Sequence, residues 1–380
     1  MKIEWQKKTI RELATVSRGA SPRPIASPRW FDTQGDIGWV RIADVNKSNG
    51  RELTYTTQKL SRDGVIRSRY LEPGSLILSI AASVGIPAIT TIPTCIHDGF
   101  VSLTNLKIDK NFLFYLLKAN RNRLLEEGQS GSQTNINSDI VRQLDLWIPS
   151  SDDEQKRIAS ALWSVDDLID LLMLKVEKKR AIKQGLMQEL LAGKTRLPGF
   201  DSEWKKSSFG TELEFLRGSM ATKELKSGQV PLIAAGIKPA GFVNKANRQG
   251  PVITISSSGA NAGFVGWHAS DIWASDCTTV SRSRGLELKL AFYLLAYMQD
   301  SIYRSQTGGA QPHVHAKDIA PIGIRFPSDP LEQSAIVEVI DAADSEIQAL
   351  EKQLESAKAI KQGMMQELLT GKTRLPKEKQ

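Results

Sequence analysis

An 18-residue segment occurs twice in this chain, and the repeat constrains the fold more than any other feature. Residues 181–198 read AIKQGLMQELLAGKTRLP and residues 359–376 read AIKQGMMQELLTGKTRLP, so 16 of 18 positions are identical at an offset of 178. A near-identical internal repeat of this length indicates a tandem duplication. The chain is therefore expected to fold as two related halves.

The duplication extends upstream of this segment, but at scattered positions only. Matched positions at the offset of 178 are Glu154 with Glu332, Gln155 with Gln333, Gly131 with Gly309, Gln133 with Gln311 and Asp98 with Asp276. Nearer the start the offset is 199, as for Arg18 and Arg217, which places a net insertion of 21 residues between Gly19 and Asp98. Near-identical repeat ends predict two copies of one partner, whereas divergent lobes predict two different targets.

The composition is that of a folded protein with two domains. The chain has 380 residues, 41% apolar and 24% charged, and a formal net charge of +8, which favours a polyanionic partner such as nucleic acid. Two cysteines are too few for a secreted disulfide framework. No signal peptide and no membrane-length apolar stretch is recognisable, so a cytoplasmic location is expected.

Four segments follow from the patterning. Residues 1–150 form a first lobe with mixed short strands and a helix, and residues 199–328 form a second lobe of the same α+β kind. Residues 151–198 and 329–380 each begin with a long helix. The predicted strands are 38–42, 75–80, a strand ending at 149, 229–233 and 251–255, and the predicted lobe helices are 111–125 and 289–298.

The two long helices carry apolar residues at alternating steps of four and three, which is the seam of a coiled coil. The seams are Ile158, Leu162, Val165, Ile169, Leu172 and Val176, and Ile336, Ile340, Ala343, Ile347, Leu350 and Leu354. Pairing across a two-fold axis would make the helices antiparallel; the alternative is that each helix packs on its own lobe. Ser151 with Glu154, and Asp329 with Glu332, are interpreted as capping residues.

No catalytic apparatus is recognisable in the sequence. The Gly-Lys-Thr runs at 193–195 and 371–373 lack the upstream glycine of a phosphate-binding loop. His313 and His315 have no companion ligands at metal spacing. Cys95 and Cys277 are interpreted as buried thiols. A duplicated, basic chain without such motifs is typical of a recognition scaffold.

The lobe–helix–lobe–helix order, the segments at 149–155 and 327–333, and the repeated 18-residue segment resemble the specificity subunit of a type I restriction–modification system over the whole length. The resemblance implies two pseudo-symmetric α+β target recognition domains joined by two antiparallel helices. It implies a split duplex DNA site, two docked modification subunits and, in addition, restriction subunits. It also implies that S-adenosylmethionine, ATP and Mg²⁺ belong to those partners, leaving this chain non-catalytic and free of cofactor and metal.

Polar and basic loop positions are the predicted DNA contacts, because Arg and Lys bind phosphates and amide or hydroxyl groups read base edges. They are Arg18, Arg23, Arg29, Lys47, Arg67, Arg69, Gln133 and Thr134 in the first lobe, and Arg217, Lys223, Lys245, Arg248, Gln311 and His313 in the second. The polar loops that contain Gln133 and Gln311 are equally consistent with a role in bracing the lobes.

The repeat ends supply the predicted partner surface, which comprises Lys183, Gln184, Met187, Gln188 and Glu189 with Lys361, Gln362, Met365, Gln366 and Glu367. Two other functions compete: a scaffold whose lobes bind protein or glycan, and a hidden nuclease or methyltransferase. Salt-dependent DNA affinity distinguishes the first alternative. Self-association by exchange of lobe and helix between chains also remains open.

Overall fold

The computed structural model describes residues 5–127, 135–220, 226–308 and 311–376. Two compact units make up the chain: Met1–Leu174 with Lys352–Gln380, and Lys175–Glu351. Each of the two long helices, α7 (Asp152–Leu190) and α12 (Pro330–Leu368), contributes one half to each unit. Gln133, Thr134 and Lys223 lie outside the described residues.

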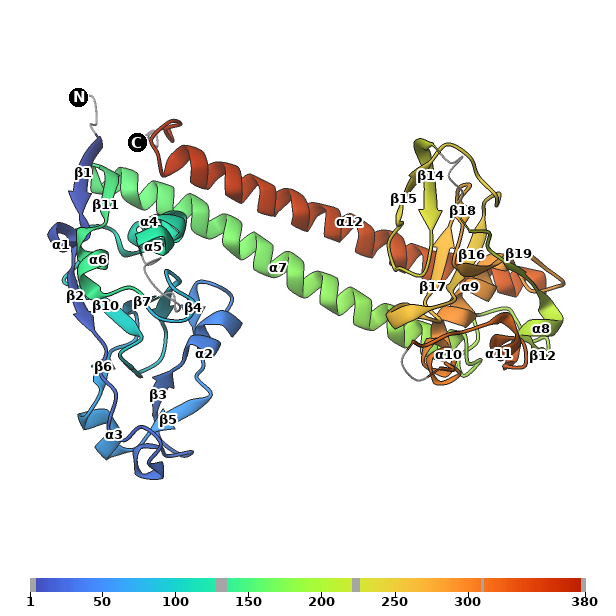
Figure 1. Ribbon diagram of the computed structural model, residues 1–380, viewed down its shortest axis with the longest axis horizontal. Helices are drawn as coiled ribbons and strands as arrows, with labels where there is room; N and C mark the ends of the chain where they lie inside the picture. Colours follow the sequence, from blue (N-terminus) through green and yellow to red (C-terminus); the bar gives the residue numbers. More distant parts are fainter. Residues whose placement is uncertain (1–4, 128–134, 221–225, 309–310, 377–380) are drawn as a thin grey trace. The chain divides into compact units, whose positions relative to one another are not determined.

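The lobe of the first unit contains three antiparallel or mixed sheets (Figure 1). β1 (Trp5–Thr9) pairs with β11 (Asp145–Pro149). The second sheet has the order β2 (Thr15–Arg18), β10 (Phe100–Thr104), β7 (Leu76–Ser79), β8 (Pro87–Thr90) and β4 (Glu52–Leu53). The third has the order β5 (Gln58–Leu60), β3 (Ile37–Val40), β9 (Thr94–Ile96) and β6 (Arg69–Leu71).

Short helices connect these strands. They are α1 (Ile10–Leu13), the 3₁₀ turn η1 (Pro28–Trp30), α2 (Ile42–Lys47), α3 (Arg62–Ile66), α4 (Lys110–Ala119), α5 (Arg121–Glu127) and α6 (Ser138–Gln143). The sequence predicted one helix over 111–125, whereas the chain forms α4 and α5 with a break at Asn120. The Asn120 side-chain amide donates to the carbonyl of Leu116, which ends the first of them.

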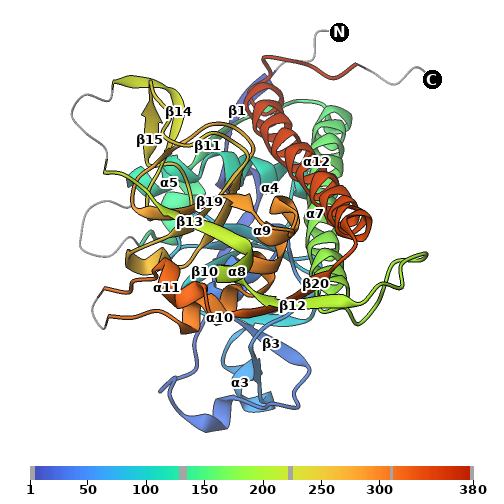
Figure 2. The same ribbon diagram turned by 90° about the vertical axis from the view of Figure 1, so that its right-hand side faces the viewer.

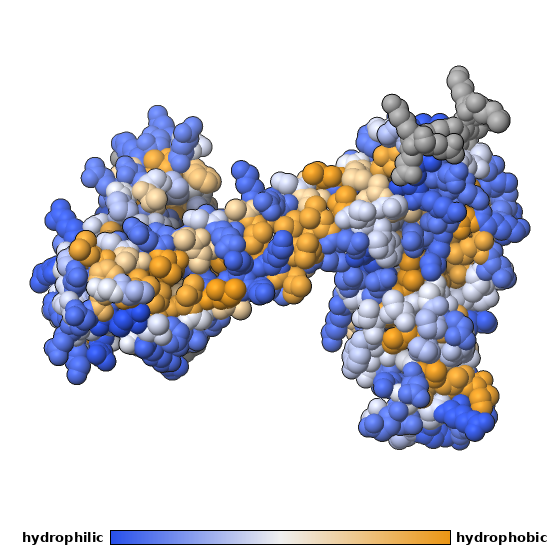
Figure 3. Space-filling view, turned by 180° about the vertical axis from the view of Figure 1, so that it is seen from behind, coloured by the Kyte–Doolittle hydropathy of each residue, from blue (hydrophilic) through white to orange (hydrophobic). Residues whose placement is uncertain are grey.

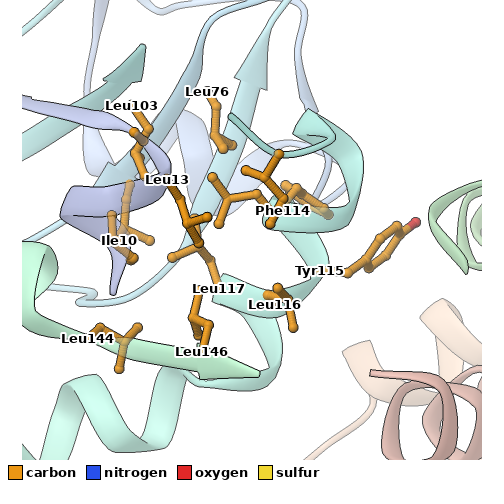
Figure 4. Close-up of a cluster of buried hydrophobic side chains, with 14 of the residues drawn as sticks. Ile10, Leu13, Leu76, Leu103, Phe114, Tyr115, Leu116, Leu117, Leu144 and Leu146 are labelled. Carbon is orange, nitrogen blue, oxygen red and sulfur yellow. The ribbon is translucent and has the colours of Figure 1, made fainter. Parts of the chain in front are cut away.

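The core of this lobe lies between the β2–β10–β7 sheet and α4, whose residues from Phe112 to Leu117 are all buried. A helix buried on every face packs on several layers at once. Figure 4 shows Leu13, Leu76 and Leu117 meeting in this cluster, while Tyr115 points away from it. The start of α7 joins the same core through Ile158, Ala159 and Leu162, as do Leu368 and Leu369 from the end of α12.

The lobe of the second unit repeats the main sheet. β13 (Leu213–Arg217), β19 (Cys277–Ser283), β16 (Val252–Ser256) and β17 (Val265–His268) pair antiparallel in the order found for β2, β10, β7 and β8. β12 (Trp204–Ser208) pairs with β20 (Gly323–Pro327), and a smaller sheet has the order β15 (Gly241–Val243), β14 (Ser227–Ile233) and β18 (Trp273–Ala274). Its helices are α8 (Phe209–Glu212), η2 (Gly259–Asn261), α9 (Leu288–Tyr297), α10 (Gln299–Arg304) and α11 (Ala316–Ile319).

The predicted coiled-coil seam is buried at most positions and partly buried at Val165, Ala343, Leu350 and Leu354. The predicted α+β class and antiparallel helix pair are confirmed. Figures 1 and 2 show α7 and α12 side by side. Ile169, Leu172 and Val176 are buried on α7, and Ile347 on α12. The first apolar residues of each helix instead join the core of the lobe that precedes them. Each helix therefore packs on its own lobe at its start and on the other helix beyond it.

Candidate nucleic-acid interface and partner surface

An arginine at the end of each repeat binds a buried glutamate at the start of the other helix. In the first unit the Arg374 guanidinium binds the Glu154 carboxylate, with an Nε–Oε1 distance of 2.8 Å. In the second unit Arg196 binds Glu332, whose side chain is fully buried, with an Nη2–Oε2 distance of 2.6 Å. Two parallel N–H···O bonds make this the strongest ordinary form of an ion pair.

A tryptophan from the first strand of each lobe lies against the glycine of the repeat. Gly371 has φ +72° and Gly193 has φ +65°, and a Cβ there would lie 2.7 Å from the Trp5 ring and 3.1 Å from the Trp204 ring. The Trp204 indole N–H also donates to Glu332 at 3.4 Å. The Gly-Lys-Thr-Arg run resembles part of a phosphate-binding loop in sequence. In both units it instead joins the end of one long helix to the start of the other.

The capping interpretation of Glu154 and Glu332 was wrong. Their carboxylates bind Arg374 and Arg196 rather than the backbone N–H of Ser151 or Asp329. A buried carboxylate is stabilised far more by an arginine than by one exposed backbone N–H, and the antiparallel packing of the helices brings that arginine within reach. Ser151 does cap α7, since its hydroxyl accepts from the Glu154 N–H at 3.4 Å.

The glutamine that follows each glutamate fixes the lobe helix to the long helix. The Gln155 carbonyl accepts from the backbone N–H of Asp109 at 3.0 Å, and its amide donates to the Pro149 carbonyl at 3.0 Å. Gln333 accepts from the backbone N–H of Glu287 and donates to Pro327. The repeated Glu-Gln pair is therefore a structural joint in both units.

Tyrosine, aspartate and lysine form a second matched contact midway along the helices. In the first unit the Tyr115 hydroxyl donates to Asp166 at 2.7 Å, as its direction in Figure 4 suggests, and Lys361 binds the other oxygen of that carboxylate. Burial, followed by the hydrogen bond to Asp166, raises the pKa of Tyr115. The second unit has the same contact among Tyr293, Asp344 and Lys183, each 178 residues away.

The predicted partner surface divides into residues used inside the chain and residues left at the surface. Lys183 and Lys361 bind Asp344 and Asp166, and Met187 and Met365 pack on the lobe cores. Glu189 and Glu367 accept hydrogen bonds from Thr195 and Thr373. Gln184, Gln188, Gln362 and Gln366 are exposed. One turn apart, each pair of glutamines lies on one face of its helix.

In the second unit these glutamines line a groove of about 880 Å³ between the long helices and α9–α10. Arg180, Lys183, Asp344 and Glu351 supply charges to its walls, and Met187 and Ile347 supply apolar surface. A groove that combines some apolar surface with charges of both signs suits a protein segment better than a nucleic acid. Apolar side chains also reach the surface of α7 (Figure 3), where Leu168, Leu171 and Leu174 are exposed.

The first unit has a loop on the corresponding face of its helices. Arg51 of this loop is buried and binds Asp167 and Asp170 on α7 at 2.7 and 2.8 Å, with its guanidinium 4.6 Å from the Trp163 ring centroid. At the positions of Asp167 and Asp170, α12 has Ser345 and Gln348. Arg51 lies within the region of the 21-residue net insertion, so the two lobes are attached to their helices differently.

Three predicted DNA contacts of the first lobe converge where β2 ends. The Arg18 Nε donates to the Asp98 carbonyl at 2.9 Å, Arg23 approaches the Asp98 carboxylate at 3.4 Å, and Arg69 donates to the Arg18 carbonyl. The Ser21 hydroxyl donates to Asp98 and lowers the pKa of its carboxyl. Only glycine fits at position 19, because a Cβ there would lie 2.1 Å from the His97 carbonyl oxygen.

The remaining first-lobe candidates lie elsewhere on that lobe. Arg29 and Arg67 lie over the Trp30 ring, with guanidinium carbons 3.8 and 5.7 Å from its centroid. Lys47 is exposed in the last turn of α2. The structure thus groups Arg18, Arg23 and Arg69 at the end of β2 and places Arg29 and Arg67 on the Trp30 ring.

The second lobe has the same arrangement at the end of β13. Arg248 donates to the Arg217 carbonyl at 2.7 Å, just as Arg69 donates to the Arg18 carbonyl in the first lobe. Arg248 also donates to the Thr279 hydroxyl and to the Asn247 carbonyl. Its guanidinium is therefore occupied within the lobe, whereas Arg217, Lys245 and Gln311 are exposed. His313 lines a cleft of about 600 Å³ together with Arg217.

Sequence reasoning missed four residues of this edge: Asp98 in the first lobe, and Asp276, His315 and Lys317 in the second. Asp276 accepts from the Ser258 hydroxyl, as Asp98 accepts from Ser21. The match of Asp98 with Asp276 at the offset of 178 was the available signal, but it was used only to define the repeat. His315 and Lys317 lie two and four residues after the predicted contact His313, and that proximity was a signal that went unused.

Neither thiol is placed for catalysis. Burial raises the pKa of Cys95 to about 11 and that of Cys277 to about 12. Within the described part of the chain, no cluster of three His, Cys, Asp or Glu side chains could hold a metal ion. No helix among the described residues is both long and apolar enough to cross a membrane.

Two divergent lobes with basic edges, joined through a duplicated helix pair, are typical of a recognition protein. The family model described as the type I restriction modification DNA specificity domain matches residues 2–183 and 202–359. The chain belongs to this family, and is thus a non-catalytic, DNA sequence-recognising subunit of a type I restriction–modification system.

Characterised relatives and solved structures agree with this assignment. The EcoprrI specificity subunit of Escherichia coli is 22% identical over 91% of this chain and 88% of its own length. A putative type I specificity subunit of Mycoplasma genitalium is 22% identical over 71% of this chain and 73% of its own length. The crystal structure of the type I system S subunit from M. genitalium is 19% identical, with a TM-score of 0.71 over 100% of this chain and 98% of that one. This last likeness shows the fold.

Proposed function

We propose that the chain recognises a two-part, asymmetric duplex site, with one lobe on each half, and that it docks two modification subunits. The proposal is supported by the contrast between the matched contacts of the two helix ends and the differing side chains at the edges of the two lobes. Arg374–Glu154 and Arg196–Glu332 close the same joint twice, while the lobe edges carry Arg18, Arg23 and Arg69 on one side and Arg217 with His313 on the other. Two different edges would read two different half-sites.

Arginines and lysines at these edges would anchor the phosphate backbone, and the neighbouring amides, imidazoles and hydroxyls would read base edges. The docked subunits would carry S-adenosylmethionine and methylate adenine at N6, on a base flipped out of the duplex. Restriction subunits with ATP and Mg²⁺ would complete the assembly in the cytoplasm. This chain would supply the sequence choice and no cofactor.

For docking, the exposed glutamine pairs at 184 and 188 and at 362 and 366 give the two subunits equivalent contacts. The groove beside Gln184 and Gln188 supports this assignment, because its lining combines apolar side chains with charges of both signs, as suits a folded protein segment. Arg51 and its loop make the corresponding face of the first unit different. Two subunits could therefore bind with unequal affinities.

Methylome sequencing tests the DNA-recognition proposal. The chain is expressed with the modification subunit from its own locus in a host without other adenine methyltransferases. The expected result is N6-methyladenine at one asymmetric two-part motif. Arg217→Ala should relax or abolish only one half of that motif, and Arg18→Ala only the other. If the two proteins co-purify but the DNA is not methylated, the proposed role of the lobes is contradicted. If methylation and co-purification are both lost, a scaffold whose lobes bind protein or glycan is favoured.

Docking is tested separately by native mass spectrometry of the co-purified complex. Gln184→Glu with Gln188→Glu should remove one modification subunit, and Gln362→Glu with Gln366→Glu should remove the other. Lys175→Glu, at an exposed position of α7, is the matched control and should retain both. Retention of two subunits by both paired variants would overturn this surface.

A further inference from the structure

The cleft of the second lobe gathers ionisable side chains from three separate elements. It has a volume of about 600 Å³, and its ionisable lining comes from the end of β13, from the turn before β19 and from residues 313–317, which lead into and begin α11. The charged or titratable members are Arg217, Asp276, His313, His315 and Lys317. Ser257, Ser258 and Thr278 add hydroxyl groups.

The two histidines stand on a fixed backbone. His313 exchanges backbone hydrogen bonds with Thr307 at 2.8 and 2.9 Å, and the next residue, the buried Val314, donates to the Ser257 carbonyl at 3.1 Å. The backbone N–H of His315 donates to Asp318 at 2.9 Å. The rings are nearly parallel, at 10°, with centroids 6.0 Å apart, which is too far for face-to-face contact. Among the described residues, the His313 imidazole has no hydrogen-bond partner.

The charge of this cleft depends on those imidazoles. Arg217 and Lys317 supply basic side chains to the cleft, and Asp276, which accepts from Ser258, is the carboxylate of the lining. Asp318 lies behind His315 and accepts its backbone N–H. An imidazole ordinarily changes its charge between about pH 5 and pH 8, and its protonated form donates from both nitrogens. Two protonations would therefore add two positive charges and new N–H donors.

The first lobe has asparagines at the two corresponding positions, and both are used internally. The Asn137 side-chain oxygen accepts from the N–H groups of Asp139 and Ile140 at 2.9 Å, and Asn135 accepts from Ala82 at 3.4 Å. An amide does not titrate. His97 lies beside Asp98 in that lobe, and burial, followed by the nearby Arg41, lowers its pKa. The titratable pair thus distinguishes one lobe from the other.

We propose that this cleft binds a phosphodiester of the second half-site, and that His313 and His315 make the affinity of that half-site depend on pH. The inference rests on the proposed function, because it presumes that the second lobe binds duplex DNA. Arg217 and Lys317 hold the phosphate at any pH. The imidazolium groups add charge-assisted hydrogen bonds to its oxygens only when they are protonated.

Duplex binding by the full chain, in complex with its modification subunit, tests this. Fluorescence anisotropy measures the Kd for a duplex with the methylated motif at about pH 6 and about pH 8 and equal ionic strength. The affinity of the unmodified chain should rise about tenfold at the lower pH, and its salt dependence should steepen by about one phosphate contact. The paired variant His313→Asn with His315→Asn, which carries the first-lobe residues, should bind equally at both pH values.

His268→Asn is the matched control in the same lobe. His268 Nε2 lies 2.9 Å from the Thr254 hydroxyl, and burial lowers its pKa, so this variant should keep the pH dependence. If the folded paired variant retains the pH dependence of the unmodified chain, the inference is overturned while DNA recognition stands. If the paired variant methylates a different second half-motif, the inference is also overturned, because the two histidines would then contact bases and not a phosphate. No duplex binding at either pH would refute the proposed function itself.

Discussion

In the first unit Tyr115, Asp166 and Lys361 meet, and in the second unit the same three residue types meet 178 positions away. The two units differ beside this contact. Tyr293 has a second acceptor in Asp341, where the first unit has Trp163. Arg51 binds the first unit's helix at aspartates that the second unit replaces with serine and glutamine. The duplication thus preserved the contacts between the helices and let the attachments of the lobes diverge.

This comparison gives the near-identity of the repeats a cause inside the chain. The sequence predicted that identical surfaces meet identical partners, and the structure shows that part of each repeat contacts the start of the opposite long helix. Every substitution at Arg196 or Arg374 must satisfy a buried glutamate of the opposite helix. The exposed glutamines are under no such constraint, so the fact that both repeats have glutamine at these positions still supports two equivalent partners.

The largest effect is expected at the buried glutamates. Glu332→Ala should lower the free energy of unfolding by about 3 kcal/mol, because it leaves Arg196 and the Trp204 N–H without their acceptor. Glu154→Ala should cost about 1 kcal/mol less, since Arg374 is more exposed and Trp5 does not share the carboxylate. Urea denaturation followed by tryptophan fluorescence measures both. Equal losses of stability in the two variants would contradict the predicted difference. The control Glu177→Ala, at an exposed position, should change the free energy of unfolding little.

The next largest effect separates the two tyrosine contacts. Asp166→Ala should cost about 2 kcal/mol, because both the Tyr115 hydroxyl and the Lys361 ammonium lose their partner at a buried position. Asp344→Ala should cost about 1 kcal/mol, since Tyr293 keeps Asp341. Equilibrium unfolding of the two variants and of Tyr115→Phe with Asp166→Ala checks this. A double variant no more stable than Asp166→Ala alone would contradict the role of Tyr115.

A more local effect is expected at Arg51. Arg51→Ala should cost about 1 to 2 kcal/mol, most of it in the attachment of the loop around residues 48–52 to α7. Hydrogen exchange should become faster in that loop and near Asp170, with no change in the second unit. Arg62→Ala, at an exposed position of the same lobe, is a suitable control. Uniform acceleration in both units would show a global effect instead.

The smallest effect concerns the thiols, one in each lobe. Burial raises the pKa of Cys95 to about 11 and of Cys277 to about 12, whereas an unfolded thiol titrates near about 8.5. A raised folded pKa contributes full stability below the unfolded value and loses it as pH rises above about 8.5. Alkylation by iodoacetamide at about pH 8 should therefore require unfolding. Rapid labelling of the native chain would contradict the burial.

The sequence alone determined the duplication and the α+β class, because these depend on the repeat offset and on apolar residues at fixed spacing. The antiparallel pairing of the long helices was one of two arrangements that the sequence allowed, and the family resemblance favoured it. It also placed strands β3, β7, β11, β14 and β16 within two residues, and the starts of both long helices within one residue. These signals are local, so a linear reading finds them.

Only the tertiary structure decided which side chains meet. Glu154 and Arg374 are 220 residues apart, and the capping interpretation failed because sequence spacing gives no hint of that partner. The same holds for Arg51 on α7 and for Lys317 beside Arg217, which come together when separate elements pack. Periodicity fixes which face of an element is buried, but the identity of the group across that face is set by the fold.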